Sequence, residues 1–395
     1  MPFGTLLLIC CGITFGCYFA AFMRLPVVPL HALALGVDTT RIGIINAGFF
    51  LMAGLLSLPL GMAADRWNRR KMAAVGLLVL GLSSLALFAC RTFIHFSLAY
   101  LMLGVGIAAF GPTMMTMVSL LSPATHLGRA YGWYTTAIFC GMSLGPALGG
   151  YLARTVGASQ VFLAAGTLLF LDLGLLFWLL PSDLRPRETA AVSDDRPDTQ
   201  AALFRNRPLW GCWLMTVGAC FGMGMFMSFM PLHAEGQGLD VGQIGLVFSA
   251  QGLCNGASRI PFGRLSDRVA RRSTLVVAGI ALYGIALLGC GAAASPGVFV
   301  VSASLLGIGL GLAFTSIGAL IVEVVPAESR GSAIGGYNTC IYLGMMMSSA
   351  IMGPVCEDFG FAAGFYLTAA ANLLLLAVFY WLVKDFSIGR EAEEG

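Results

Sequence analysis

Long apolar runs, separated by short polar segments, account for almost the whole chain. A helix needs roughly 20 apolar residues to cross a bilayer. Twelve runs of about this length lie near 5–30, 42–63, 72–91, 96–120, 131–153, 160–181, 209–231, 243–262, 273–292, 297–322, 333–355 and 363–383. The pattern predicts an all-α membrane protein with twelve transmembrane helices.

The composition favours a membrane protein over a soluble one. The 395 residues are 58% hydrophobic and only 10% charged, whereas about a quarter of the residues of a soluble protein are charged. The formal charge is +3, and the basic residues form short clusters between apolar runs, which does not indicate a nucleic-acid surface. We therefore expect the lipid bilayer as a partner and no nucleic acid.

The chain shows no motif of an enzyme or a cofactor site. It has no phosphate-binding loop and no catalytic Ser, His or Cys constellation. Its eleven cysteines lack metal-ligand spacing and fall mostly within apolar runs, where cysteine packs as a small hydrophobic residue. We expect no enzymatic activity, no cofactor and no structural metal.

One long polar segment, residues 182–208, separates two halves, 1–181 and 209–395. Its Pro, Asp and Arg content is typical of a flexible linker. The linker, the other loops that follow even-numbered spans and the C-terminal tail would all lie on one side of the membrane. That side holds 17 of the 22 Lys and Arg residues. The positive-inside rule then predicts cytoplasmic termini, and we expect a monomer in the cytoplasmic (inner) membrane.

The two halves repeat one another, which is the strongest internal signal. Pro29 to Ala32 match Pro231 to Ala234 at an offset of 202, and later matches have an offset of 203. A charged loop after span 2 recurs after span 8. The paired positions are Gly61, Asp65, Arg66, Arg69 and Arg70 in the first half and Gly263, Asp267, Arg268, Arg271 and Arg272 in the second. Six spans per half give both halves the same topology, a parallel repeat about the membrane normal.

The two loops, each G-x-x-x-D-R-x-x-R-R, resemble the signature of the major facilitator superfamily. The resemblance covers essentially the whole chain. It implies two six-helix halves that alternate access to a central cavity, with these loops as a cytoplasmic gate that links the halves in the outward-open state. Anchoring to the cytoplasmic side also explains the arginines, but it explains the aspartates less well, because acids contribute little to topology.

Span 5 carries a second pattern, G-x8-G-x3-G-P-x2-G-G. Its positions are Gly132, Gly141, Gly145, Pro146, Gly149 and Gly150. The pattern resembles the antiporter motif of drug and metabolite exporters in the same superfamily. Glycines four residues apart let helices approach closely, and proline bends a helix, so this span could act as a pliable joint. The alternative is ordinary packing of small residues.

Two departures argue against the proton-antiport route familiar from drug exporters. Tyr100 stands in span 4 where those exporters usually carry an arginine, and span 1 lacks an embedded acid. Asp172, near the centre of span 6, is instead the candidate proton carrier, because a protonated aspartate is tolerable in the membrane. The alternative for Asp172 is a structural hydrogen bond between helices.

Two arginines within the spans are candidates for binding an organic anion. Arg24 lies in span 1, and Arg259 lies in span 8 below Asn255 and Gln251 at four-residue steps, so these three share one helix face. A guanidinium beside amides suits a carboxylate, and the Asn-x-x-x-Arg pattern resembles organic-anion members of the superfamily. The alternative for both arginines is snorkelling.

Other residues within the spans support further alternatives. The repeat-related Tyr134 and Tyr337 are candidates for substrate contact or packing, and His31 and His233 are expected to be structural. Met223 and Met227, one turn apart, would allow a copper importer. We expect a secondary transporter that exports a small amphipathic or drug-like molecule, with a coupling proton as a possible second partner. The alternatives are an organic-anion transporter, a copper importer and a non-transporting sensor.

Overall fold

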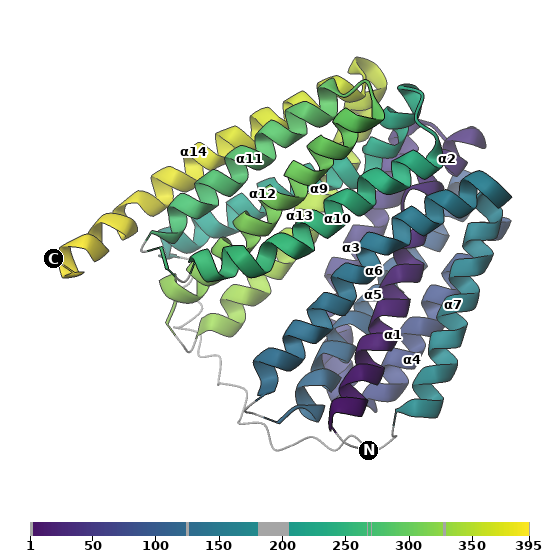
Figure 1. Cartoon of the computed structure of the whole chain (residues 1–395), viewed down its shortest axis with the longest axis horizontal. Helices are drawn as coiled ribbons and strands as arrows, with labels where there is room; N and C mark the ends of the chain where they lie inside the picture. Colours follow the sequence, from purple (N-terminus) through teal and green to yellow (C-terminus); the bar gives the residue numbers. More distant parts are fainter. Residues whose placement is uncertain are drawn as a thin grey trace. The chain divides into compact units, whose positions relative to one another are not determined.

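The computed structural model describes residues 3–123, 126–180, 205–266, 268–269, 271–326 and 329–394, without the side chains of 3, 65, 66, 128 and 385–394. Its helices, shown in Figure 1, are α1 (Phe3–Met23), α2 (Val27–Ala34), α3 (Thr39–Arg66), α4 (Arg69–Ala89), α5 (Phe93–Leu121), α6 (Leu127–Val156), α7 (Ala158–Leu179), α9 (Arg207–Gly236), α10 (Val241–Ser266), α11 (Arg272–Ala292), α12 (Pro296–Val324), α13 (Arg330–Phe359) and α14 (Phe361–Glu394). No strand occurs among the described residues, and the predicted all-α fold is confirmed.

Eleven helical segments within the described residues are long and apolar enough to cross a membrane. One of them, Gly4–Ala34, combines α1 and α2, so the first predicted span is broken near Arg24. Pro26 and Pro29 lack the N–H group of a regular helix, and the amides of Val27 and Val28 bond to the Arg24 carbonyl. The predicted span missing from these eleven segments is the eighth, which corresponds to α10. Its 26 residues are long enough to cross a membrane but include several amides and arginines.

The backbone reproduces the sequence repeat at the helix ends. Gly36 and Gly238, 202 positions apart, have φ values of 81° and 85°. Gly157 and Gly360, 203 positions apart, have φ values of 98° and 85°. Glycine adopts this left-handed region without a steric penalty, so the same device ends the equivalent helices of both repeats.

The described helices form two compact units that differ from the sequence halves. The first unit comprises Met1–Thr189 with Met227–Gly252, and the second comprises Ala190–Phe226 with Leu253–Gly395. Most of the predicted linker, up to residue 204, lies outside the described residues. The division into halves at 181 and 209 stays a prediction.

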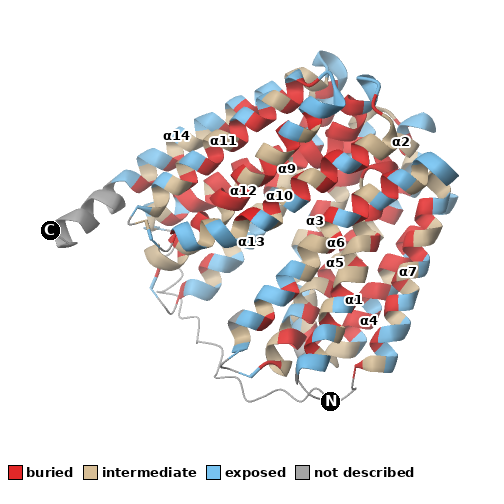
Figure 2. Ribbon diagram, viewed as in Figure 1, coloured by how far each residue is buried: buried red, intermediate tan, exposed pale blue. Residues whose placement is uncertain are grey.

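The first unit has a core to which α1, α4, α5, α6 and α7 contribute. Figure 2 shows buried residues concentrated along the inner faces of these helices. Cys10 and Cys17 of α1 are fully buried there, with Leu77 of α4, Phe110 of α5 and Leu169 of α7. The two cysteines therefore pack as small hydrophobic residues, as their apolar surroundings in the sequence predicted.

Three glycines of α6 bring this helix into backbone contact with α1. A Cβ atom on Gly141 would lie 2.8 Å from the Phe15 carbonyl oxygen, and one on Gly145 would lie 2.6 Å from that of Phe19. A Cβ on Gly149 would overlap the Met23 carbonyl. Four-residue steps on both helices keep the contact on one face of each, so α6 and α1 pack with no side chain between them.

We expect Gly149→Ala to destabilise the protein, because the new methyl group collides with backbone that cannot turn away. Overpacking of this kind costs about 1–3 kcal/mol. Gly132→Ala on the same helix is the matched control, since nothing lies within 4 Å of its Cβ position. Thermal unfolding of the purified protein measures both. Equal melting temperatures for the two variants would contradict the backbone contact.

Candidate functional site

Arg259 and Asn255 come together on α10 in the second unit. The Arg259 Nε donates to Asn255 Oδ1 at 3.1 Å, and Asn255 is 7% exposed. The Ser258 hydroxyl donates to the Asn255 carbonyl at 2.9 Å, and Gly311 of α12 packs closely against both Ser258 and Asn255. Asn255 thus orients a half-buried guanidinium, whose two Nη groups are those that form forked contacts with a carboxylate.

Tyr337 of α13 joins this pair. It lies close enough to Arg259 for the two groups to interact electrostatically, and its ring meets Phe314 edge-on at 6.3 Å between centroids. Three of the predicted substrate residues, Asn255, Arg259 and Tyr337, therefore gather in one unit. Gln251 is 5% exposed and is grouped with the first unit, so the structure does not add it to this cluster.

Arg24 is placed in the interior of the first unit. It is 2% exposed, and its Nη1 donates to the Ser84 hydroxyl of α4 at 2.6 Å. Tyr100 of α5 lies within electrostatic range, while Nε and Nη2 have no hydrogen-bond partner among the described residues. Sequence reasoning missed Ser84, and it treated Tyr100 only as a lost arginine. The sequence signal that could have identified them is that Ser84 and Tyr100 are polar residues within otherwise apolar spans.

Tyr134, predicted as a substrate contact, lies in the core of the first unit. It is 2% exposed, and its hydroxyl donates to the Gly111 carbonyl of α5 at 3.1 Å. These contacts are those of a packing residue that links α6 to α5. A role in substrate binding stays a prediction.

Asp172 lies on α7 against α1. It is 7% exposed, and its Oδ2 has no hydrogen-bond partner among the described residues. The carboxyl group packs on Gly16, where a Cβ would lie 2.8 Å from the Asp172 Cγ. An ionised carboxylate in such surroundings is costly. The site suits an acid that holds a proton in this state, and Gly16 provides its space.

The loops predicted to form the gate have different contacts in the two repeats. Arg70 donates to the Phe177 carbonyl and lies over the Phe177 ring, with Cζ 5.1 Å from the ring centroid. Arg272 bonds the Ser266 carbonyl at 3.3 Å and pairs with Glu323 of α12 at 3.4 Å. Glu323 was not predicted, although it is an acid at the end of an apolar span.

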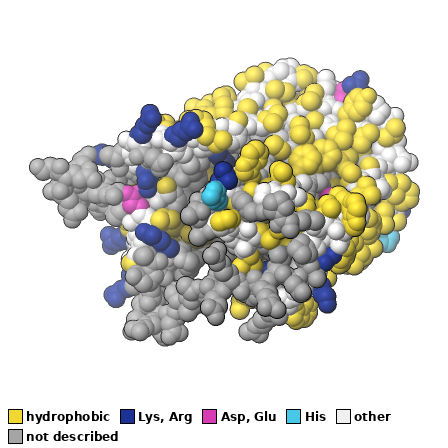
Figure 3. Space-filling view, turned by 60° about the horizontal axis from the view of Figure 1, so that its bottom comes forward, with side chains coloured by type: hydrophobic (Ala, Val, Ile, Leu, Met, Phe, Trp, Pro, Cys, Tyr) yellow, Lys and Arg dark blue, Asp and Glu magenta, His cyan; other side chains and the backbone are white. Residues whose placement is uncertain are grey.

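Some of the predicted gate residues fall partly or wholly outside the described residues. The side chains of Asp65 and Arg66, and the whole of Asp267, lie outside the described residues. Arg69 begins α4, and Arg271 directly precedes α11. Figure 3, which brings the lower end of Figure 1 forward, shows Lys and Arg side chains at several places on that face. The gate role of these loops stays a prediction.

The glycine-proline pattern of α6 has a second face, which contacts the first part of α10. A Cβ on Gly150 would overlap the Val241 carbonyl, and one on Gly245 would overlap the Pro146 carbonyl. One turn apart on α6, Pro146 and Gly150 therefore face α10, while Gly141, Gly145 and Gly149 face α1. Sequence reasoning found the α6 pattern but missed its partner Gly245.

The histidine and methionine candidates have apolar surroundings. The His31 ring meets Phe162 edge-on at 5.5 Å between centroids, and Met223 and Met227 are 6% and 7% exposed. Within the described residues, His, Cys, Asp and Glu form no group of three that could hold a metal ion. Among the described residues, no contact of Met223 or Met227 with a histidine supports the copper alternative.

Comparisons with known proteins agree on one family. The model of the Major Facilitator Superfamily matches residues 10–243 and 212–394. The multidrug resistance efflux pump PmrA of Streptococcus pneumoniae is 26% identical over 87% of each chain. The multidrug resistance protein MdtG of Dickeya zeae is 24% identical over 95% of this chain and 94% of its own.

Solved structures show the same fold. A bacterial homologue of the human lysosomal transporter Spinster superposes with a TM-score of 0.81, at 14% identity, over 97% of this chain and 98% of its own. The nucleoside transporter NupG superposes with a TM-score of 0.79, at 14% identity, over 96% of this chain and 99% of its own.

We expect Gly16→Ala to lower the melting temperature, because the methyl group collides with the Asp172 carboxyl group. Overpacking costs about 1–3 kcal/mol, whereas Gly12→Ala, with nothing within 4 Å of its Cβ position, is the control on the same helix. In an Asp172→Ala background the Gly16→Ala penalty should disappear, a coupling that a double-mutant cycle detects. An unchanged penalty in that background would contradict the placement of Asp172.

Proposed function

Since the chain belongs to the Major Facilitator Superfamily, we propose that it exports small amphipathic, drug-like molecules by alternating access. The observation that carries this proposal is the glycine-proline run of α6, which contacts α1 on one face and α10 on the other with backbone alone. Because small residues let the backbones approach closely, these contacts can separate and close again without the repacking of bulky side chains. The similarity to PmrA and MdtG over most of each chain supports the direction and the class of cargo.

We propose that a proton is the coupling ion and that Asp172 carries it. Among the described residues, Asp172 is the carboxylic acid placed near the middle of a span and 7% exposed. Its packing between α7 and α1 would link protonation to the fit of these two helices. Alternation of a buried carboxyl group between neutral and charged forms is a standard means of proton coupling in membrane transporters.

Export is tested by reconstitution of the purified protein in liposomes with an imposed pH gradient. We expect accumulation of a fluorescent lipophilic cation against its gradient, and none in vesicles with the gradient dissipated. A panel of amphipathic cations, neutral compounds and organic anions defines the cargo class. Absence of flux with every member of the panel would refute the proposed export.

Asp172→Asn should abolish gradient-driven accumulation while leaving downhill exchange of the same cargo, because the amide fits the space but cannot release a proton. We expect accumulation to fall at least tenfold, measured as the ratio of internal to external cargo. Retained pH-driven accumulation in this variant would exclude Asp172 as the proton carrier.

The second candidate function is transport of an organic anion, favoured by Arg259 held by Asn255 beside Tyr337. Arg259→Ala should lower uptake of a carboxylate cargo about tenfold or more, because a charged hydrogen bond contributes about 1.5–3 kcal/mol. Arg259→Lys keeps the positive charge but loses the forked guanidinium, and its carboxylate uptake should lie between that of the parent protein and that of Arg259→Ala. Full carboxylate uptake by Arg259→Ala would rule this function out.

A further inference from the structure

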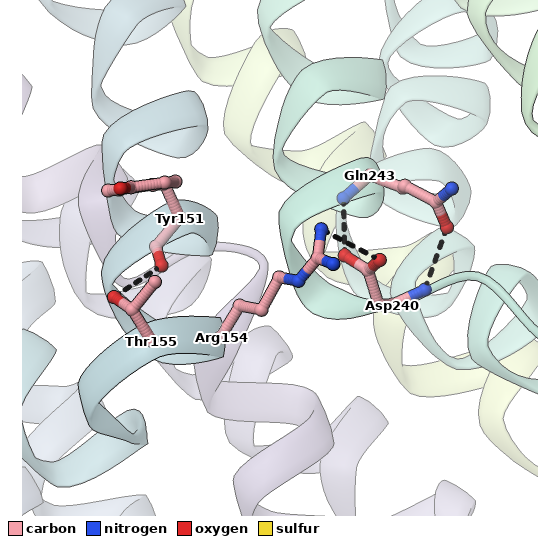
Figure 4. Close-up of polar contacts among 5 residues, drawn as sticks. All are labelled: Tyr151, Arg154, Thr155, Asp240 and Gln243. Carbon is pink, nitrogen blue, oxygen red and sulfur yellow. Dashed lines mark hydrogen bonds and ion pairs between the residues drawn. The ribbon is translucent and has the colours of Figure 1, made fainter.

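An ion pair joins α6 to the segment that precedes α10. Arg154 Nη1 lies 3.3 Å from Asp240 Oδ2, and Figure 4 shows the two side chains reaching toward each other. Arg154 lies in the last turn of α6, and Asp240 directly precedes α10. Both residues belong to the first unit, but they come from different sequence repeats. The sequence repeat matches Asp240 to Asp38, but no motif in the sequence pointed to its pairing with Arg154.

Two hydrogen bonds with Gln243 position Asp240 for this contact. Its backbone N–H donates to Gln243 Oε1 at 3.0 Å, and its Oδ1 accepts from the Gln243 N–H at 3.0 Å. This reciprocal arrangement is a capping box, which satisfies amides at a helix start. Because Oδ1 is used by the cap, Oδ2 is the oxygen that meets Arg154 (Figure 4).

Divergence of the repeats explains why this pair exists. Asp38, the equivalent of Asp240, accepts from the Arg41 N–H at 2.7 Å, and it pairs with the Arg41 side chain at 3.2 Å. In the second repeat the position of Arg41 is occupied by Gln243, so Asp240 has no basic partner on its own helix at that place. The repeat-equivalent of Arg154 is Glu357. Of the two repeat-related positions at the ends of α6 and α13, the one in α6 therefore carries an arginine, Arg154, which pairs with Asp240.

The ion pair ends a seam in which α6 and α10 are in backbone contact, except at Ser143, whose small side chain packs on Gly252. Gly150 meets Val241, Pro146 meets Gly245, and the Ser143 hydroxyl would lie 2.7 Å from a Cβ on Gly252. Backbone contacts have no flexible side chain that could stretch to follow a small movement. Such a seam is either closed or separated, as is usual for packed interfaces.

We propose that Arg154 and Asp240 form a latch that closes the outer end of the α6–α10 seam and must open in each transport cycle. The proposal rests on the proposed alternating access and on the predicted orientation, which places this end of α6 outside. The side chains of Arg154 and Asp240 are 62% and 37% exposed. An exposed pair of this kind biases an equilibrium by about 0.2–1 kcal/mol, so loss of the charge should raise the open-to-closed ratio up to about fivefold.

The latch can be tested by measuring the distance between the outer ends of α6 and α9, since α9 leads directly into the start of α10. Spin labels at Val156→Cys and Gly236→Cys would report it by pulsed electron resonance in liposomes. Val156 is 57% exposed, and nothing lies within 4 Å of the Gly236 Cβ position. None of the eleven native cysteines is exposed, so the parent protein serves as the labelling blank.

Asp240→Asn is the decisive variant, because asparagine keeps an oxygen for the helix cap but loses the charge. We expect the long-distance population to rise about two- to fivefold in Asp240→Asn and in Arg154→Gln, and no further in the double variant. Arg154→Lys should retain most of the closed population. High salt should shift the parent toward the open form and leave Asp240→Asn unchanged.

An unchanged distance distribution in Asp240→Asn would overturn the latch, as would additive effects in the double variant. The readout requires no cargo. A shift of the expected size in a protein that moves no compound would therefore uphold the latch and refute the proposed export. If the protein transports cargo but the distance between the labels is the same in all variants, export would be upheld and the latch refuted.

Discussion

Close approach of α6 to its neighbours is the constraint on which the first unit depends. In a bilayer, lipid tails solvate apolar side chains as well as other helices do, so association relies on close packing. The glycines of α6 give that packing on two faces: Gly149 meets the Met23 carbonyl of α1, and Gly150 meets the Val241 carbonyl of α10. Neighbouring residues of one helix thus serve two partners, and a side chain at Gly149 or at Gly150 would disturb the contact that this glycine makes.

The second constraint is the cost of polar groups in an apolar interior. Arg24 is 2% exposed, and Asp172 is 7% exposed. The structure meets this cost differently at the two sites: the Ser84 hydroxyl accepts from Arg24, while Asp172 faces the bare backbone of Gly16. A group buried with unsatisfied atoms is poised to change its state, because protonation or a new partner would relieve the penalty. In the proposed mechanism, these residues would link the packing of α1 to the ion or cargo that the transporter moves.

The sequence repeat leaves similar backbone at equivalent positions, and small divergences give these positions different contacts. The turns at Gly36 and Gly238 keep nearly the same backbone. The aspartates that follow them no longer have the same partners, since Asp38 pairs within its own helix and Asp240 pairs with Arg154. At the predicted gate loops, Arg272 pairs with Glu323, whereas the equivalent of Glu323 in the first repeat is Leu120. A symmetric scaffold can therefore hold asymmetric contacts at both ends.

The sequence alone determined the helices, the repeat and the family, because each membrane helix must satisfy its own backbone and display about 20 apolar residues. Both properties are local and can be read along the chain. The tertiary structure decided which polar groups meet. The partners Arg24 and Ser84 are 60 positions apart, and Arg154 meets Asp240 only because α6 and α10 pack at a particular depth and rotation. Rotation about a helix axis is set by the packing of all neighbours together, so a linear pattern found the glycines of α6 but could not find Gly245, Ser84 or Asp240.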